Sequence, residues 1–183
     1  MAAAEEIFAE RGYMAASMDE IAERVGVSKP MIYEYFGSKE GLLVACLRAV
    51  RAELQAAVAA AVAKANSAED AMRRGLVAFF VFADEHRRSW DVMLRTEAAI
   101  VGKAASLEIE AARQGQIALH IEQISAYLPD LDPLVTEASA EVIVGACERL
   151  STWYVRHDEV TPEQAAEYAM QMIWFGMLSH GAD

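Results

Sequence analysis

The chain has 183 residues and a formal net charge of −12, with only 10 glycines and 4 prolines. A chain of this length can bury a real core in one or two small domains, and no long alternation of apolar and polar residues predicts a sheet. There is no uncharged apolar run long enough to span a membrane, and the start MAAAEEIF lacks the basic region of a signal peptide. We therefore predict an all-α, cytoplasmic protein without a membrane partner, in which Cys46 and Cys147 are reduced, buried thiols.

A helix-turn-helix is predicted near the N-terminus. A first helix is expected over residues 2–11, ending at Gly12, and residues 17–41 predict two short helices followed by the start of a third. Ser17 can cap the first of the two short helices, and Gly26 can end it, because glycine adopts the left-handed conformation without strain. Two short helices around a glycine-containing turn form a motif whose second helix fits the major groove of DNA.

The second helix of this motif is predicted to have an inner and an outer face. Ile32 and Phe36 lie four residues apart and are expected to face inward. On the outer face, Met31 could touch a thymine methyl group and Glu34 could accept a hydrogen bond from a cytosine amine. Lys29, Tyr33 and Lys39 would bind phosphates. The predicted DNA-contacting residues are Ser17, Ser28, Lys29, Pro30, Met31, Tyr33, Glu34, Tyr35 and Lys39.

Many residues of this segment match a known family at fixed spacing and without a gap. They are Phe8, Gly12, Tyr13, Ser17, Ile21, Ala22, Gly26, Val27, Ser28, Lys29, Ile32, Tyr33, Tyr35, Phe36, Ser38, Lys39 and Leu42. Here the chain resembles the TetR family of bacterial transcriptional regulators. The resemblance implies a nine-helix architecture, with a DNA-binding domain at residues 1–48 and a ligand-binding and dimerisation domain at residues 49–183. It also implies a homodimeric, ligand-responsive DNA-binding protein, usually a repressor.

The charge distribution partly opposes DNA binding. The first 48 residues carry five basic and eight acidic residues, and the remainder carries eleven and twenty. A DNA-binding domain normally has a basic footprint, but Lys29 and Lys39 fall where phosphates would lie, and more distant acids are screened over ~8–10 Å. The sequence starts almost inside its first predicted helix, so the basic arm usual for the family is either truncated or lost.

Six further helices are predicted from caps, breakers and apolar periodicity. Asp132 precedes a proline at the first helical position, and Thr161 begins a capping box that also contains a proline. The predicted spans are residues 38–64, 67–86, 90–101, 103–127, 132–157 and 161–180.

Aromatic residues of the second domain predict an effector pocket where its second and third helices meet, around residues 87–89. Such pockets are mostly apolar clefts between helices, and simple core packing is the alternative interpretation. The ligand is expected to be a small hydrophobic molecule, with the acidic domain weakly favouring a cationic one. The candidate ligand-binding residues are Phe79, Phe82, His86, Trp90, Met93, Glu97, Gln114, Ile117 and Tyr154.

The last two helices carry wide apolar faces with small residues, more than a single chain needs. We therefore predict a two-fold dimer through a four-helix bundle, as the resemblance also implies, with DNA-reading helices ~34–36 Å apart on a near-palindromic operator. The predicted interface residues are Val142, Ala146, Leu150, Trp153, Ala166, Ala169, Ile173, Gly176 and Met177.

Patterns typical of catalysis are missing from the sequence. The four histidines have no metal-ligand spacing, and there is no GxSxG, phosphate loop or CxxC. We expect no enzyme activity, no cofactor and no metal, and as partners a double-stranded DNA operator, a small-molecule effector and a second copy of the chain. The alternative is an all-α ligand-binding or scaffolding dimer that has lost DNA binding. The acidic first domain, Glu34 and the missing arm favour that alternative, whereas Ser17, Lys29, Tyr33 and Lys39 oppose it.

Overall fold

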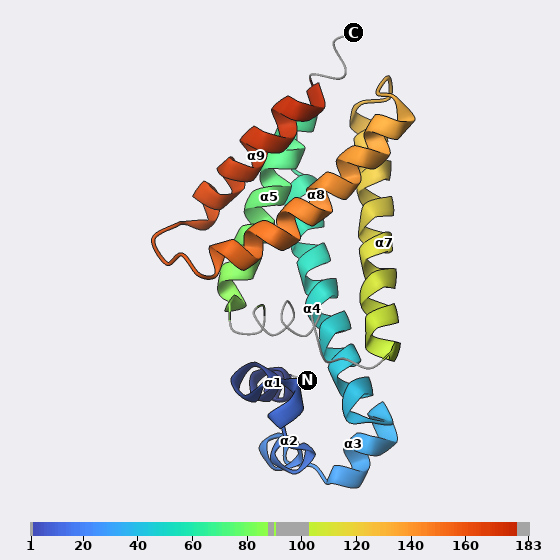
Figure 1. The fold of residues 1–183 in the computed structure, drawn as a ribbon, viewed down its shortest axis with the longest axis vertical. Coiled ribbons are helices and arrows are strands. Elements are labelled where there is room, and N and C mark those ends of the chain that lie inside the picture. The colour runs from blue at the N-terminus through green and yellow to red at the C-terminus, as the bar shows by residue number, and fades with distance from the viewer. Residues whose placement is uncertain (1, 88–89, 91–102, 179–183) are drawn as a thin grey trace. The chain divides into compact units, whose positions relative to one another are not determined.

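The computed structural model describes residues 2–87, 90 and 103–178 of the chain, and this part is helical without strands (Figure 1). The predicted all-α class is confirmed. No helix is labelled α6. Between α5 and α7, residues 88–89 and 91–102 lie outside the described residues. The helices are α1 (Ala2–Ala15), α2 (Met18–Val25), α3 (Lys29–Phe36), α4 (Lys39–Val62), α5 (Ala68–Glu85), α7 (Lys103–Tyr127), α8 (Pro133–Tyr154) and α9 (Pro162–Leu178).

Most of these helices begin where their caps predict. The Asp132 carboxylate accepts from the backbone N–H groups of Leu134 and Val135 at 2.8 and 3.3 Å, which starts α8. Thr161 and Gln164 exchange side-chain to backbone hydrogen bonds of 2.9 and 3.2 Å, so the predicted capping box at α9 is confirmed. No helix in the described part of the chain is long and apolar enough to cross a membrane.

The end of α1 differs from the prediction. Gly12 does not end the helix but kinks it, with φ 73° and ψ 159°, and helical structure continues to Ala15. This backbone conformation is essentially restricted to glycine. Beyond the kink, the N–H of Ala16 donates to the Gly12 carbonyl at 3.1 Å, so one further turn forms before α2.

Contacts divide the chain into two compact units. The first is Met1–Glu53 with His86–Glu110, and the second is Leu54–Glu85 with Ala111–Asp183. The first unit therefore contains α1, α2, α3 and the first part of α4. The predicted functional division at residues 48 and 49 stays a prediction.

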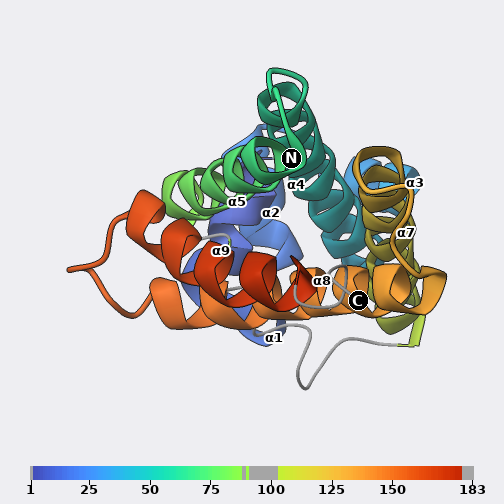
Figure 2. The same ribbon diagram turned by 90° about the horizontal axis from the view of Figure 1, so that it is seen from above.

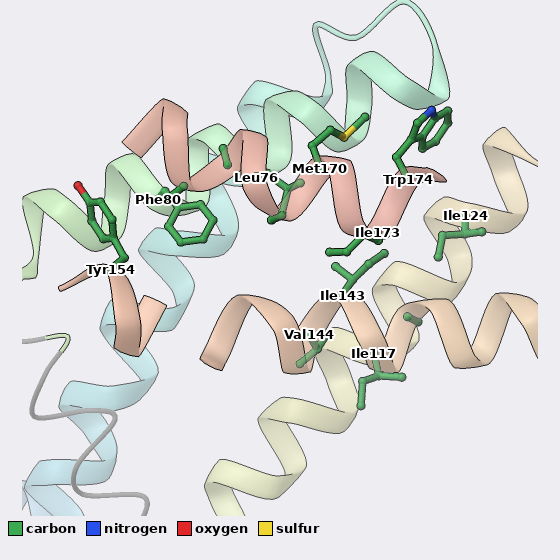
Figure 3. Packing of buried hydrophobic residues seen from close by; sticks show 14 residues of the cluster. Leu76, Phe80, Ile117, Ile124, Ile143, Val144, Tyr154, Met170, Ile173 and Trp174 are labelled. Atoms are coloured by element: carbon green, nitrogen blue, oxygen red, sulfur yellow. The ribbon is translucent and has the colours of Figure 1, made fainter. Parts of the chain in front are cut away.

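The core of the second unit is built where α9 packs on both α5 and α8, and Figures 1 and 2 both place α9 beside α5. Figure 3 shows Phe80 of α5 next to Tyr154 of α8, with ring centroids 5.7 Å apart in an edge-to-face arrangement. Tyr154 is 1% exposed, and its hydroxyl donates to the Asp84 carboxylate at 2.7 Å. These contacts fix which faces of α5 and α8 are closed, and so which remain for a ligand or a partner.

Candidate DNA-binding surface and effector cavity

A small apolar core in the first unit holds the helix-turn-helix together. It consists of buried residues from four helices: Ile7 and Phe8 of α1, Ile21 of α2, Ile32 of α3 and Leu43 of α4. Ile32 is the inward anchor of α3, as predicted, and Phe36 is half-buried on the same side. The opposite side of α3 is therefore left to solvent.

The turn between α2 and α3 is set by Gly26. It has φ 76° and ψ 29°, and its N–H donates to the Glu23 carbonyl at 3.2 Å. The N–H of Val27 reaches back to the Ala22 carbonyl at 3.1 Å, which completes a Schellman motif. Ser28 then caps α3 by accepting from the Met31 N–H at 3.4 Å. The sharp turn thus depends on a left-handed residue followed at once by a new helix cap.

The outer face of α3 carries apolar and aromatic side chains. Met31, Tyr33 and Tyr35 are 45%, 39% and 78% exposed, and Pro30 and Glu34 are also exposed. The predicted base-reading and phosphate-binding residues of this helix therefore share one accessible surface. Such a surface can offer methyl, phenol and carboxylate groups to a DNA groove.

The two lysines of the predicted surface are both held by neighbours in the same unit. Lys29 Nζ lies 2.9 Å from Asp19 Oδ2, and this hydrogen bond raises the pKa of Lys29. Lys39 Nζ donates to the Met14 carbonyl at 3.2 Å and sits 4.8 Å from the centroid of the Tyr13 ring, and burial lowers its pKa. To contact a DNA phosphate, Lys29 must therefore share or break its hydrogen bond with the Asp19 carboxylate. Lys39 must likewise share or break its hydrogen bond with the Met14 carbonyl.

Arginines on α1 and α2 are paired in the same way. Arg24 lies 3.5 Å from Glu10 and 3.8 Å from Glu20, and Arg11 lies 3.4 Å from Glu20. Acidic residues that make the first unit negative thus cancel nearby cations. The positive field that this part of α1 and α2 offers to DNA is weak.

The second unit contains a cavity of about 150 Å³. Its walls come from the last two turns of α4, the first three turns of α5, the second half of α7, the middle of α8, and Trp174 of α9. Five lining residues are labelled in Figure 3, namely Leu76, Ile124, Ile143, Val144 and Trp174. The lining is mostly apolar, with a short polar stripe on α7.

Few groups that line this cavity are charged near neutral pH. Burial lowers the pKa of His120, partly offset by a hydrogen bond with Gln123, and burial raises the pKa of Cys147 to about 12. Glu148 accepts from Arg113 Nε at 3.1 Å, so its carboxylate is paired. The cavity is thus suited to an uncharged or weakly polar molecule.

The predicted ligand-binding residues are only partly brought together. Phe79 lines the cavity, whereas Phe82, Ile117 and Tyr154 are 5%, 4% and 1% exposed in the unit without lining it, and Gln114 is exposed. The remaining predicted residues lie elsewhere. His86 and Trp90 belong to the first compact unit, and Met93 and Glu97 lie outside the described residues.

The cavity lies toward the start of α5 because that part of the helix has an open face. Small residues recur there at helical spacing, at Ala68, Ala71 and Gly75, and they leave room beside Val58 and Val62 of α4. Neither this stripe nor the polar stripe on α7, formed by Gln116, His120 and Gln123, was predicted from the sequence. Both stripes follow helical spacing, so the sequence contains the pattern. Which face of each helix would line a common cavity depends on packing between helices and does not follow from the local sequence.

The predicted dimer residues also divide into two groups. Val142 is 55% exposed and Gly176 is exposed, and Ala146, Leu150 and Trp153 are half-buried. In contrast to the prediction, Ala166, Ala169 and Ile173 are at most 6% exposed, because this face of α9 packs inside its own unit. Met177 lies in α9, but its side chain is outside the described part.

The opposite face of α9 carries large apolar side chains that the sequence analysis did not select. Tyr168, Met172 and Phe175 follow one another at helical spacing and are 44%, 79% and 68% exposed. On α8, Leu134 and Val142 are similarly exposed, at 76% and 55%. Large apolar side chains exposed on two helices that pack on each other are typical of a protein interface.

Comparison with known proteins identifies the family. The family described as "Bacterial regulatory proteins, tetR family" matches residues 1–46, and "Tetracyclin repressor-like, C-terminal domain" matches residues 68–176. The chain belongs to the TetR family of bacterial transcriptional regulators. The predicted family resemblance is therefore confirmed. Eight of the nine predicted helices are present within the described residues, and the ninth, predicted at residues 90–101, lies outside them apart from Trp90.

Individual TetR-family proteins resemble the chain over most of its length. A TetR-like transcriptional regulator from Rhodococcus sp. RHA1 is 30% identical with a TM-score of 0.76, and the match covers 97% of this chain and 92% of that one. The HTH-type transcriptional activator FasR of Mycolicibacterium smegmatis is 29% identical, covering 76% of this chain and 75% of FasR. FadR from Bacillus subtilis, solved in complex with stearoyl-CoA, shares the fold at 17% identity with a TM-score of 0.80, covering 94% of each chain.

Membership of the TetR family identifies the N-terminal helices as a module of the family. The match to residues 1–46 includes α1, α2, α3 and the first turns of α4, so the helix-turn-helix is the family's regulatory module. The family consists of transcriptional regulators and not of enzymes. In the part of the chain that the structure describes, no group of three His, Cys, Asp or Glu side chains could hold a metal ion.

Proposed function

We propose that this TetR-family transcriptional regulator represses by binding a near-palindromic operator as a homodimer, and that a small hydrophobic effector releases it. The observation that carries the proposal is the exposed face of α3. This face follows a glycine-set turn and carries Met31, Tyr33 and Glu34, with Lys29 at its start. A gel shift against the DNA upstream of its own gene tests the proposal, and Tyr33→Ala should abolish a shift that the unaltered protein gives.

Within this proposal, α3 lies in the major groove and the cations lie on phosphates. Lys39→Ala should weaken binding to all sequences alike and reduce the salt slope by ~1 for each copy of the chain. Glu34→Ala should instead change the preference between single-base operator variants. Unchanged relative affinities for Glu34→Ala would remove Glu34 from the base-reading residues.

The proposed dimer uses the outward apolar face of α8 and α9. Support comes from the exposure of Val142, Tyr168, Met172 and Phe175, and an exposed apolar patch of this kind is rarely left open. Met172→Glu should produce a monomer in sedimentation, since it places a charge in the interface. Leu107→Glu on α7, at a side chain that is 62% exposed, is the matched control and should leave the dimer intact. Equal sedimentation of the two variants would refute this interface.

The effector site that we propose is the cavity of the second unit. FadR from Bacillus subtilis was solved with stearoyl-CoA, and this supports a small-molecule effector for a chain of the same fold. FasR, in contrast, is named as an activator, so the sign of regulation needs its own test. A promoter fused to a reporter should be more active without the regulator gene if the chain represses, and less active if it activates. Action on chromosomal DNA places the proposed site of action in the cytoplasm.

A scaffolding or ligand-binding dimer without DNA binding is the second candidate. The pairing of Lys29 with Asp19, and of Arg24 with Glu10 and Glu20, favours it because the motif then has little positive charge available. The gel shift separates the candidates. Repression requires a sequence-specific complex at physiological salt, and the scaffold predicts none.

A further inference from the structure

The chemistry of the cavity in the second unit points to a narrower class of effector. We infer that the effector is a compact, uncharged molecule with an apolar body and one hydrogen-bonding group, and not a carboxylate or a CoA thioester. This inference rests on the proposed function of the cavity as the effector site. It deepens that function by naming the ligand class.

The size of the cavity limits the ligand first. A volume of about 150 Å³ is similar to that of an engineered apolar cavity that holds benzene, so a substituted ring or a short chain fits. Gly75 defines part of this space, because a Cβ built there would lie 3.4 Å from Val62 Cγ2 and 3.8 Å from Val58 Cγ1. A long acyl chain would extend beyond the space between these walls.

The charge of the lining limits the ligand next. Among the described residues that line the cavity, there is no lysine or arginine, and Glu148 is the single carboxylate. Arg113 already binds Glu148 at 3.1 Å and neutralises it. A ligand carboxylate would lose its water beside an acidic group without gaining a free cation, which is unfavourable in a partly buried site.

The polar stripe on α7 supplies the hydrogen-bonding end. Gln116, His120 and Gln123 lie three or four residues apart and all line the cavity, as do apolar residues of α5 such as Leu76 and Phe79. Amides and a neutral imidazole both donate and accept hydrogen bonds. They therefore suit a hydroxyl, carbonyl or amide group on an otherwise apolar molecule.

The test uses the full chain and two matched probes, para-methylbenzyl alcohol and para-methylbenzoate, in titration calorimetry. The probes share the ring and the methyl group and differ in the hydroxyl or carboxylate end. We expect the alcohol to bind at least about tenfold more tightly than the carboxylate. Equal or tighter binding of the carboxylate, or binding of neither probe, would overturn the inference.

Two variants locate the binding and its selectivity. Gly75→Ala adds one methyl group to the wall and should weaken the alcohol about fourfold, whereas Gly115→Ala, with no atom within 4 Å of its new Cβ, should not. Glu148→Gln removes the carboxylate from the cavity lining and should narrow the preference for the alcohol at least about threefold. Glu122→Gln, an exposed acid on α7, is the control and should leave that preference unchanged. Identical behaviour of each variant and its control would contradict the assignment to this cavity.

Stearoyl-CoA, the ligand of the Bacillus subtilis FadR structure, is the third probe. It distinguishes a failure of the proposed ligand class from a failure of the proposed regulatory role of the cavity. If it releases DNA and Gly75→Ala weakens this effect, the ligand class is wrong while the regulator with its effector cavity stands. If the alcohol binds with the expected selectivity but changes DNA binding at no concentration, the ligand class stands. In that case the proposed role of the cavity in regulation fails.

Discussion

Removing the carboxylate of Asp19 should strengthen DNA binding, because this carboxylate pairs with the Lys29 ammonium and competes with DNA phosphates for it. The two side chains meet at 2.9 Å between Nζ and Oδ2, and they are 41% and 74% exposed. An exposed pair of this kind contributes little to the stability of the fold, so Asp19→Asn should leave the thermal midpoint nearly unchanged. Its effect should appear on DNA, where Lys29 becomes free to neutralise a phosphate.

The size of the effect follows from counterion release. Each additional phosphate neutralised steepens the plot of log affinity against log salt by about 0.9, so two copies in a homodimer give up to about 1.8. A slope change of this size means that the ratio of the Asp19→Asn affinity to the unaltered protein's affinity should fall about twelvefold between 50 and 200 mM salt. Fluorescence anisotropy with a labelled operator at four salt concentrations measures both the affinity and the slope.

Two controls make this prediction specific to the pair. Glu122→Gln removes one charge from the second unit and should change neither affinity nor slope. Lys29→Ala should flatten the slope, and Asp19→Asn added to Lys29→Ala should have no further effect. An Asp19→Asn protein with an unchanged slope, or a gain that persists without Lys29, would refute the reasoning.

The remaining predictions concern stability. Gly75→Ala and Gly115→Ala, both inside helices, should each raise the thermal midpoint through a helix propensity gain of about 0.5–1 kcal/mol, and a lower midpoint for Gly75→Ala would contradict the ordinary contact distances at its Cβ. Tyr154→Phe removes the hydroxyl that donates to Asp84 at 2.7 Å and should cost about 1 kcal/mol in urea unfolding, whereas equal stability would show that water replaces the bond. His120 has its pKa lowered in the folded protein, so the unfolded chain binds more protons as pH falls through 6.5, and stability should drop on acidification. His120→Gln should lose part of this pH dependence, and identical pH profiles would exclude His120 as its source.

Features set by neighbouring residues in sequence could be predicted. The capping box of Thr161 and Gln164, the Asp132 cap and the left-handed Gly26 all appear where local rules place them. The inner position of Ile32 also follows from helical spacing alone. Gly26 and Ile32 belong to the helix-turn-helix, so local rules were enough to predict this motif and with it the family.

Features set by packing between helices could not be predicted in the same way. Helix α9 is apolar on two faces, and only its packing on α5 and α8 decides that Ala169 is buried while Met172 is exposed. The cavity likewise depends on where five helices, α4, α5, α7, α8 and α9, leave room, and Phe80 near the end of α5 fills the core instead. Of the predicted pocket, Phe79 therefore lines the cavity while Tyr154 is packed against Phe80.

The central claim is that α3 reads DNA in a symmetric dimer, and selection from a random-sequence duplex library with the full chain tests it most directly. We expect enrichment of one near-palindromic sequence with half-sites about one helical turn, ~34–36 Å, apart. The Glu34→Ala protein should select a sequence altered within each half-site. Failure of the unaltered protein to enrich any sequence, or enrichment of a single half-site without symmetry, would contradict the account.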